Sequence, residues 1–277
     1  MPTTLLLMVF YFVPFGYTLY DSLTNWDIAS NSGRWVGLKN YARLWHGQGF
    51  QQALGHTVLY ALGTIPASIG LGLLAALLLN APIRGRGLYR TLYFAPVVAP
   101  MIASALVFAW LVSPFGGIVN DVLGLLGIQP INFLHNVHWA MIIVIIYSVW
   151  QVVGYNMVIY LAALQSIPRM YYDAARLDGA NSFQVFRYLT WALIRPSTLF
   201  LTVIGVINAL QMFNQVYILT GGGPLSSTTV LVYWLYQEAF TYFNGGLATA
   251  GSIVLFVIGA LLTWLQFRFL ARRQYDL

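Results

Sequence analysis

The chain has 277 residues, of which 59% are hydrophobic and only 7% are charged. A soluble domain carries about 25% charged residues, so this composition excludes an ordinary globular protein and indicates an integral membrane protein. A membrane-spanning helix uses about 20 apolar residues, and roughly six such helices fit into one domain covering 1–277. The formal net charge of +6 is spread over short loops rather than gathered on one face, which argues against nucleic-acid binding.

Six apolar runs are long enough to cross a bilayer. The first lacks a basic leading region and a small-x-small cleavage site, so we expect a retained helix rather than a signal peptide. A tryptophan-rich polar segment at 21–52 follows it, which is typical of a loop near lipid headgroups. We expect a shorter helix at 228–243, at the outer surface or dipping partway into the membrane. The six predicted spans are 3–20, 54–79, 91–112, 139–164, 197–219 and 248–269.

Between the fourth and fifth spans the chain becomes charged, over 171–196. Met170 to Leu177 contains strong helix formers, and Gly179 then favours an exit from helical geometry. We expect Ser182 to be the N-cap of a second short helix with one apolar face. Such a pair of helices could lie on the membrane, fold under neighbouring spans or insert into a groove of a partner.

The basic residues test the topology, because cytoplasmic loops are enriched in Lys and Arg. With six spans, ten of the thirteen fall on one side, and only Arg34, Lys39 and Arg43 fall on the other. We therefore expect an all-α membrane protein with both termini and the 171–196 segment in the cytoplasm. The ten are Arg84, Arg86, Arg90, Arg169, Arg176, Arg187, Arg195, Arg268, Arg272 and Arg273.

The sequence Asp173-Ala174-Ala175, followed three residues later by Gly179, resembles the cytoplasmic "EAA" loop of permeases in binding-protein-dependent ATP-binding-cassette (ABC) importers. Over about 59–268, the order of spans, the GGGP turn at 221–224 and the following STTVLVYWLYQEAF resemble carbohydrate-type importer permeases. The chain departs from the family pattern in two ways. Asp173 stands where the family has glutamate, and Pro196 comes four residues late.

The resemblance implies a type I importer-permease fold in a prokaryotic cell membrane, in contact with lipid. It implies four partner chains of three kinds: a second homologous permease, two cytoplasmic ATPase subunits and an external solute-binding protein. The chain itself would be non-catalytic and bind no cofactor, with ATP and magnesium on the ATPase; it contains no phosphate-cradling GxxxxGK[ST] motif. Within a coupling loop at about 165–196, the residues implied to meet the ATPase are Asp173, Ala174, Ala175, Asp178, Gly179 and Ala180.

Polar and aromatic side chains inside the spans are candidates for a solute path, because such groups are costly against lipid. Three amides recur at helical spacing on the fifth span, and the fourth span carries a stripe that includes Gly154. Amides beside aromatic rings suit a sugar, whose hydroxyls need hydrogen-bond partners and whose C–H faces pack on rings. The predicted path residues are Tyr147, Trp150, Gln151, Tyr155, Asn208, Gln211 and Gln215.

Several alternatives stay open from the residues alone. The polar residues could hold helices together rather than bind solute. An anionic solute, such as glycerol 3-phosphate or a glycerophosphodiester, would favour Arg or Lys along the path. An ion- or proton-coupled secondary transporter would need ionisable groups near the midplane, where none is predicted. No nucleophile–base constellation indicates an enzyme, and the four histidines lack a metal-ligand spacing, so we assign no metal.

Overall fold

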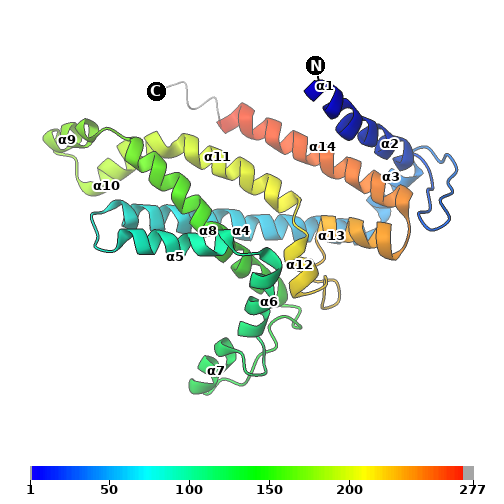
Figure 1. The fold of residues 1–277 in the computed structure, drawn as a ribbon, viewed down its shortest axis with the longest axis horizontal. Coiled ribbons are helices and arrows are strands. Elements are labelled where there is room, and N and C mark those ends of the chain that lie inside the picture. The colour runs from blue at the N-terminus through cyan, green and yellow to red at the C-terminus, as the bar shows by residue number, and fades with distance from the viewer. Residues whose placement is uncertain (1, 271–277) are drawn as a thin grey trace.

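The computed structural model describes residues 2–270 and is built from helices that run mostly along one long axis (Figure 1). Three π-helical turns interrupt or extend them: η1 (Met8–Phe12), η2 (Val185–Thr190) and η3 (Gln237–Thr241). The α-helices are α1 (Pro2–Leu7), α2 (Val13–Ser22), α3 (Lys39–His46), α4 (Gln48–Asn80), α5 (Arg86–Val98), α6 (Met101–Leu111), α7 (Ile118–Leu125), α8 (Ala140–Ser166), α9 (Arg169–Leu177), α10 (Ser182–Gln184), α11 (Trp191–Leu210), α12 (Asn214–Leu219), α13 (Leu231–Tyr236) and α14 (Gly245–Leu270).

Five continuous helical stretches are long and apolar enough to cross a membrane, and the bent pair α5–α6 makes a sixth. This confirms the predicted number of spans. The third span is not the single helix expected over 91–112, because α5 and α6 meet at an angle of 102°. Ala99 is extended between them, as expected of a residue that precedes a proline, and Pro100 begins the new direction.

The second helix of the 171–196 segment and the fifth span are also one element rather than two. Helical geometry runs without a break over Ser182–Leu210, through α10, η2 and α11. It stops earlier than the expected residue 219, and the chain turns at 211–213 before α12. The fifth span therefore begins in the segment that carries the charges.

The centre of the bundle is the pair α4 and α8, which cross closely because small residues lie at their contact. A Cβ atom at Gly72 of α4 would collide with Asn156 of α8. At the neighbouring contact of α8 with α5, a Cβ atom at Gly154 would collide with the backbone of Tyr93. Small residues of this kind let membrane helices approach each other where no hydrophobic effect drives them together. α5 and α11 flank this pair, and α2 packs antiparallel on α14 (Figure 1).

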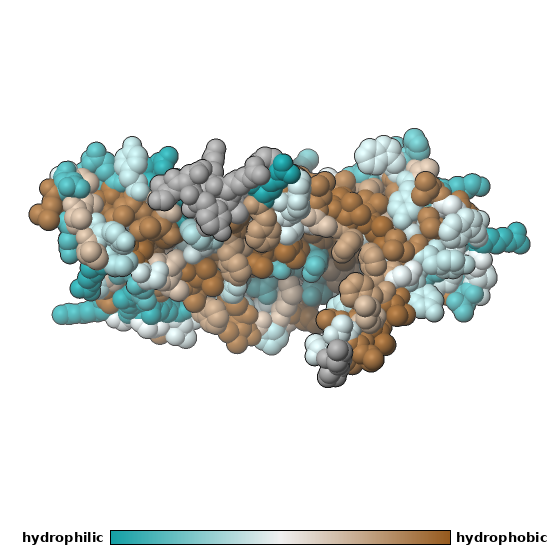
Figure 2. Space-filling view, turned by 90° about the horizontal axis from the view of Figure 1, so that it is seen from above, coloured by the Kyte–Doolittle hydropathy of each residue, from teal (hydrophilic) through white to brown (hydrophobic). Residues whose placement is uncertain are grey.

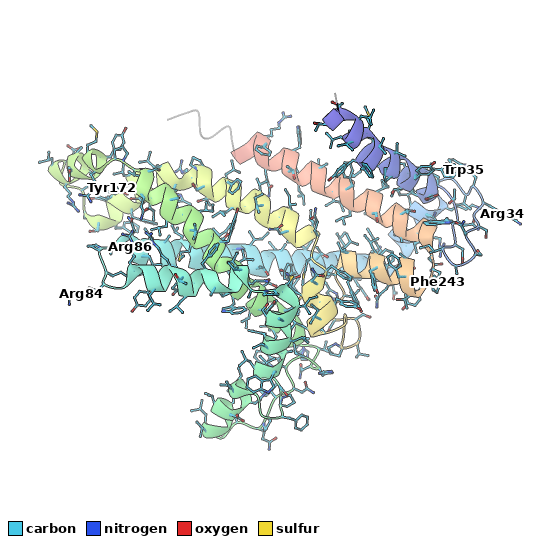
Figure 3. The ribbon with its side chains drawn as sticks, viewed as in Figure 1. Arg34, Trp35, Arg84, Arg86, Tyr172 and Phe243 are labelled. Carbon is cyan, nitrogen blue, oxygen red and sulfur yellow. The ribbon has the colours of Figure 1, made fainter. Side chains whose placement is uncertain are left out.

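Polar side chains gather at the two ends of the long axis, and apolar side chains cover the stretch between them (Figure 2). Arg84 and Arg86 lie at the same end as Tyr172 of α9, whereas Arg34 lies at the opposite end with Trp35 and Phe243 (Figure 3). This separation agrees with the predicted asymmetry of basic residues. Two of the ten predicted cytoplasmic arginines, Arg272 and Arg273, lie outside the described residues.

At the end that carries Arg34, which we name the outer end, hydrogen bonds join segments far apart in the sequence. The amide of Asn40 donates to the carbonyls of Ser22 and Thr24, at 2.9 and 2.6 Å. The backbone N–H of Leu231 donates to Thr57 Oγ1 at 2.9 Å, which fastens α13 to α4. Backbone bonds from Ile28 to Phe243 and from Gly246 to Trp26 tie the first loop to the start of α14. The outer loops thus form one connected unit.

Candidate functional site

α9 ends in a Schellman motif, which fixes the turn predicted at Gly179. The N–H of Ala180 donates to the carbonyl of Ala175 and that of Gly179 to the carbonyl of Arg176, both at 3.0 Å. Gly179 has φ +78°, a left-handed conformation that favours glycine. The predicted helix over 170–177 and its stop are therefore confirmed.

The helix that follows begins one residue earlier than predicted. Asn181, not Ser182, is its N-cap: the side-chain oxygen of Asn181 accepts from the N–H of Gln184 at 2.9 Å. The side chain of Gln184 in turn accepts from the N–H of Asn181 at 2.8 Å, which completes a capping box. Had Ser182 been the cap, the third helical position would be Val185, which has no side chain able to return the bond.

The surface of the α9–α10 segment leaves large apolar side chains uncovered in the described chain. Leu177 is 89% exposed and Phe183 is 73% exposed, and Met170 and Tyr188 are exposed as well. A cavity of about 380 Å³ opens beside them. Apolar groups in this number on a charged segment indicate a surface that another chain covers. The cavity is lined by Ala175, Asp178, Gly179, Ala180, Gln184, Val185, Tyr188 and Leu189.

Four of the six predicted coupling residues thus share one hollow, and Asp173 and Ala174 lie outside it on the exposed face of α9. The carboxylate of Asp173 lies 4.0 Å from Arg176, one turn away. Both side chains are largely exposed, so this ion pair contributes little to stability. The segment is positioned by its backbone turn rather than by its charges.

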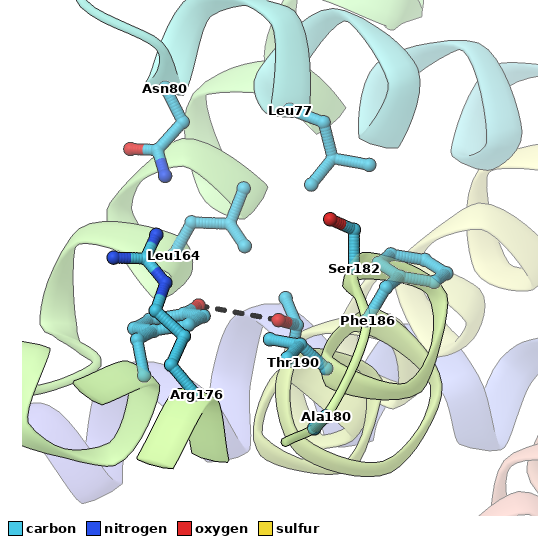
Figure 4. A pocket seen from close by; sticks show the side chains of 10 residues that line it. Leu77, Asn80, Leu164, Arg176, Ala180, Ser182, Phe186 and Thr190 are labelled. Carbon is cyan, nitrogen blue, oxygen red and sulfur yellow. Dashed lines mark hydrogen bonds between the residues drawn. The ribbon is translucent and has the colours of Figure 1, made fainter. Parts of the chain in front are cut away.

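A second cavity, of about 310 Å³, separates the segment from the ends of α4 and α8 (Figure 4). Leu77 and Asn80 line it from α4, and Arg176 and Ser182 line it from the segment. Beside it, a hydrogen bond of 3.3 Å joins Tyr172 Oη of α9 to Thr190 Oγ1 at the end of η2. Tyr172 and Trp191 pack against the buried ends of α4 and α8, so the segment meets these spans next to the cavity rather than across it.

The predicted stripe on α8 does not form one open face. Tyr147 is completely buried, and its hydroxyl donates to the carbonyl of Met101 and bonds Ser104 Oγ at 2.8 Å. Gly154 packs on the backbone of α5. Trp150 is exposed, whereas Gln151 and Tyr155 are half-buried. α6 and α5 thus cover two points of the stripe, because the bent third span lies against α8.

The three amides predicted to share one face of the fifth span are separated by the break in the helix. Asn208 lies in the last turn of α11, Gln211 is in the turn, and Gln215 belongs to α12. The expectation of one continuous helical face was wrong, because it assumed a helix to residue 219. None of the three side-chain amides has a hydrogen-bond partner within residues 2–270. Their donors and acceptors are free for a ligand.

The turn at 211–213 brings Phe213 into an aromatic cluster that the sequence prediction did not include. We name Phe213, Tyr217, Tyr233, Tyr236 and Phe240 the aromatic wall; the centroids of its neighbouring rings are 5.1–6.3 Å apart. The hydroxyl of Tyr233 donates to the carbonyl of Gly221 at 2.9 Å, which holds the wall against the GGGP turn. In the sequence, the spacing of residues 233, 236 and 240 by three and four positions could have predicted that these rings share one helix face.

A cavity of about 700 Å³ lies beside the aromatic wall, lined by the first outer loop, the turn at 211–213, α13, η3 and the first half of α14. Phe213, Tyr236 and Phe240 line it, and Gln211 contributes a side-chain amide to the same lining. The hydroxyls of Thr249 and Ser252 also line it, and each already donates to a carbonyl of its own helix. The site combines flat aromatic faces with a free amide, which are the groups that bind sugar C–H faces and hydroxyls.

Broken spans around a helical core, with an exposed cytoplasmic segment of EAA type, define the membrane-spanning subunit of an ABC importer. The family model described as "Binding-protein-dependent transport system inner membrane component" matches residues 68–275, so the chain belongs to this family. It is accordingly a multi-pass inner-membrane protein and a non-catalytic permease subunit, with ATP hydrolysis on a separate subunit.

Curated relatives match over nearly the whole chain. The lactose transport system permease protein LacF of Rhizobium radiobacter is 37% identical over 91% of this chain and 88% of its own. The sn-glycerol-3-phosphate transport system permease protein UgpA of Agrobacterium fabrum is 34% identical over 97% of this chain and 93% of its own.

A solved structure has the same fold. A chain from a bacterial ABC transporter involved in the import of the acidic polysaccharide alginate superposes with a TM-score of 0.86 at 23% identity, covering 98% of this chain and 93% of that chain. This likeness confirms the predicted type I permease fold.

Proposed function

We propose that this chain is the translocation subunit of an ATP-driven importer that takes up a neutral carbohydrate, meaning a sugar, an oligosaccharide or a polyol. It would act with a second homologous permease, two cytoplasmic ATPase subunits and an external solute-binding protein that delivers the solute. The observation that carries the proposal is the free amide of Gln211 beside the aromatic wall, in a cavity whose lining within residues 2–270 includes no charged side chain.

The solutes named for the two relatives differ in charge. LacF is a lactose permease and UgpA a glycerol-3-phosphate permease, by their names. A phosphate bound in a water-poor cavity needs Arg or Lys, because an unpaired charge is expensive to desolvate. The neutral lining of this cavity therefore favours a lactose-like solute over glycerol 3-phosphate or a glycerophosphodiester, which stay the second candidates on the strength of UgpA.

The third possibility, an ion- or proton-coupled secondary transporter, is excluded by membership of the binding-protein-dependent family. The remaining path residues, Trp150, Gln151, Tyr155, Asn208 and Gln215, are proposed to meet the solute in the complete importer. Tyr147 is proposed to act from behind them, because its hydroxyl is already engaged.

The α9–α10 segment, within about 165–196 of a single domain covering 1–277, is proposed to be the coupling element that docks in the ATPase. Exposed Leu177 and Phe183, and the hollow lined by Ala175, Asp178, Gly179 and Ala180, support this role. Asp173 and Ala174 would contact the rim of the ATPase cleft.

The test begins by purifying the chain from native membranes and identifying its partners. Uptake by the reconstituted importer is then measured for a neutral disaccharide, a polyol and glycerol 3-phosphate. Gln211→Leu is expected to reduce uptake of the neutral solute about 5- to 150-fold, because an unpaired solute hydroxyl costs about 1–3 kcal/mol. The control is Gln129→Leu, an exposed loop amide outside the cavity, which should transport normally.

Two results would contradict the proposal. Uptake of glycerol 3-phosphate without any neutral solute would overturn the solute class. Normal transport by Gln211→Leu would remove Gln211 from the path.

A further inference from the structure

Two arginines at the cytoplasmic end of α5 converge on one amide of α8. Arg86 and Arg90 are one helical turn apart, and Gln165 lies in the last turn of α8. With the Gln165 amide oriented by its donors, its oxygen accepts from Arg90 at 2.8 Å and from Arg86 at 2.6 Å. Two guanidinium groups are therefore held within contact of the same atom.

Neither arginine has a counter-charge in the described part of the chain. The one ion pair found within residues 2–270 joins Asp173 and Arg176, on the coupling segment. The Nε atoms of Arg86 and Arg90 are buried and have no hydrogen-bond partner among the described residues. Two like charges held on one neutral amide raise the local positive potential, and an anion beside the pair would lower it.

The backbone adds to this potential. α5 begins after Gly85, which has φ +76° and offers no side chain to cap the helix. The first N–H groups of a helix have no intrahelical acceptor and carry a partial positive charge. Arg84, exposed just before the helix, lies at the same end (Figure 3). Arg84 and the start of α5 thus add positive charge at the same end of the molecule as the arginine pair.

Next to the arginine-bearing face, α5 presents two exposed aromatic side chains. Tyr89 is 48% exposed and Tyr93, one turn further, is 43% exposed, and helical periodicity places both beside Arg86 and Arg90. A pair of guanidinium groups beside an exposed, largely apolar strip has the chemistry that an anionic phospholipid needs. Basic residues immediately cytoplasmic of a span are the usual binding site for anionic headgroups.

We propose that Arg86 and Arg90, held in place by Gln165, form a binding site for an anionic phospholipid, with the headgroup phosphate beside the two guanidinium groups and an acyl chain along Tyr89 and Tyr93. This inference is independent of which solute the importer carries. Because Gln165 lies immediately before the coupling segment, the bound headgroup would rest against the end of the helix that leads into it.

The test uses the purified complex in detergent and a phosphatidylglycerol that carries a fluorescent acyl chain. Unlabelled phosphatidylglycerol should displace the probe, whereas phosphatidylcholine and inorganic phosphate at the same concentration should not. R86Q/R90Q should bind the probe about thirtyfold more weakly, at about fivefold per lost charge. R34Q/R43Q, which removes two charges from the outer end, is the matched control and should bind normally.

The variant R86K/R90K distinguishes a specific phosphate site from non-specific attraction of the lipid to positive charge. It keeps both charges but loses the planar donors, so we expect affinity between that of the parent and that of R86Q/R90Q. Equal affinity in R86Q/R90Q and R34Q/R43Q would overturn the proposal, as would equal displacement by inorganic phosphate. Loss of the ATPase subunit from R86Q/R90Q, with probe affinity unchanged, would assign the pair to the ATPase interface and overturn it too.

Discussion

The two ends of the molecule are built in opposite ways. At the outer end, buried Asn40 and Thr57 each hydrogen-bond to backbone of a distant segment, and His56 Nδ1 lies 3.0 Å from the carbonyl of Thr229. At the cytoplasmic end, the α9–α10 segment has local turn bonds and a single side-chain hydrogen bond back to the helix that follows, from Tyr172 to Thr190.

The difference lies in the bonds that hold each end in place. The outer loops are joined by hydrogen bonds between distant segments of this chain. The α9–α10 segment, which we propose to be the coupling element, has one such side-chain bond and rests over a cavity, so its position depends more on what covers it. Changes at the outer end should therefore alter stability, and changes in the segment should alter coupling.

The largest effect is expected from Gly179→Val. A β-branched residue at φ +78° costs about 1–3 kcal/mol of strain, although a Cβ there would meet open space. The strain should reshape the docking turn without disturbing the spans. We expect solute-stimulated ATP hydrolysis to fall at least about tenfold, measured with the purified importer.

Gly179→Asn is the matched control, since asparagine tolerates left-handed geometry better than other residues with a side chain. It should retain most of the coupling. Full transport by Gly179→Val, with normal retention of the ATPase subunit, would show that this turn is not the coupling element.

A smaller effect, on stability rather than on coupling, is expected from Asn40→Ala. Loss of the buried amide leaves the carbonyls of Ser22 and Thr24 without their donor and should cost about 1–3 kcal/mol. Thermal unfolding of the purified complex should shift downward, while the ratio of transport to ATP hydrolysis stays unchanged. Asn132→Ala, at an exposed loop position, should leave the unfolding temperature unchanged. Uncoupling by Asn40→Ala at normal stability would break the contrast between the ends.

The smallest effect is expected from Asp173→Ala. Its ion pair with Arg176 is long and exposed, so it should contribute on the order of 1 kcal/mol or less to docking. Solute-stimulated ATP hydrolysis should fall less than about fivefold, and the deficit should shrink at high salt. A loss as large as that of Gly179→Val would mean that the charge, not the turn, holds the ATPase.

The sequence predicted the features that depend on local chemistry. Composition and arginine placement predicted the six spans and the polar ends, and Gly179 marked the end of α9. Features that depend on packing were not predictable in the same way. Pro100 was visible, but whether a proline bends a span depends on its neighbours. The turn at 211–213 has neither glycine nor proline, and Phe213 reaches the aromatic wall only because the helix ends before it.

The continuous helix over Ser182–Leu210 connects the proposed coupling segment directly to the turn at 211–213. Two separate helices would not transmit a movement from one to the other in this way. At 1.5 Å per residue, the 29 residues of the continuous helix form a rod of about 43 Å. One end begins at the capping box of Asn181, in the proposed docking segment, and the other ends at Gln211 beside the 700 Å³ cavity. A tilt of about 5° of such a rod moves its far end by about 4 Å, more than the length of a hydrogen bond. If the proposed functions hold, a slight rocking of the docked segment would be enough to make or break a contact between Gln211 and a bound sugar.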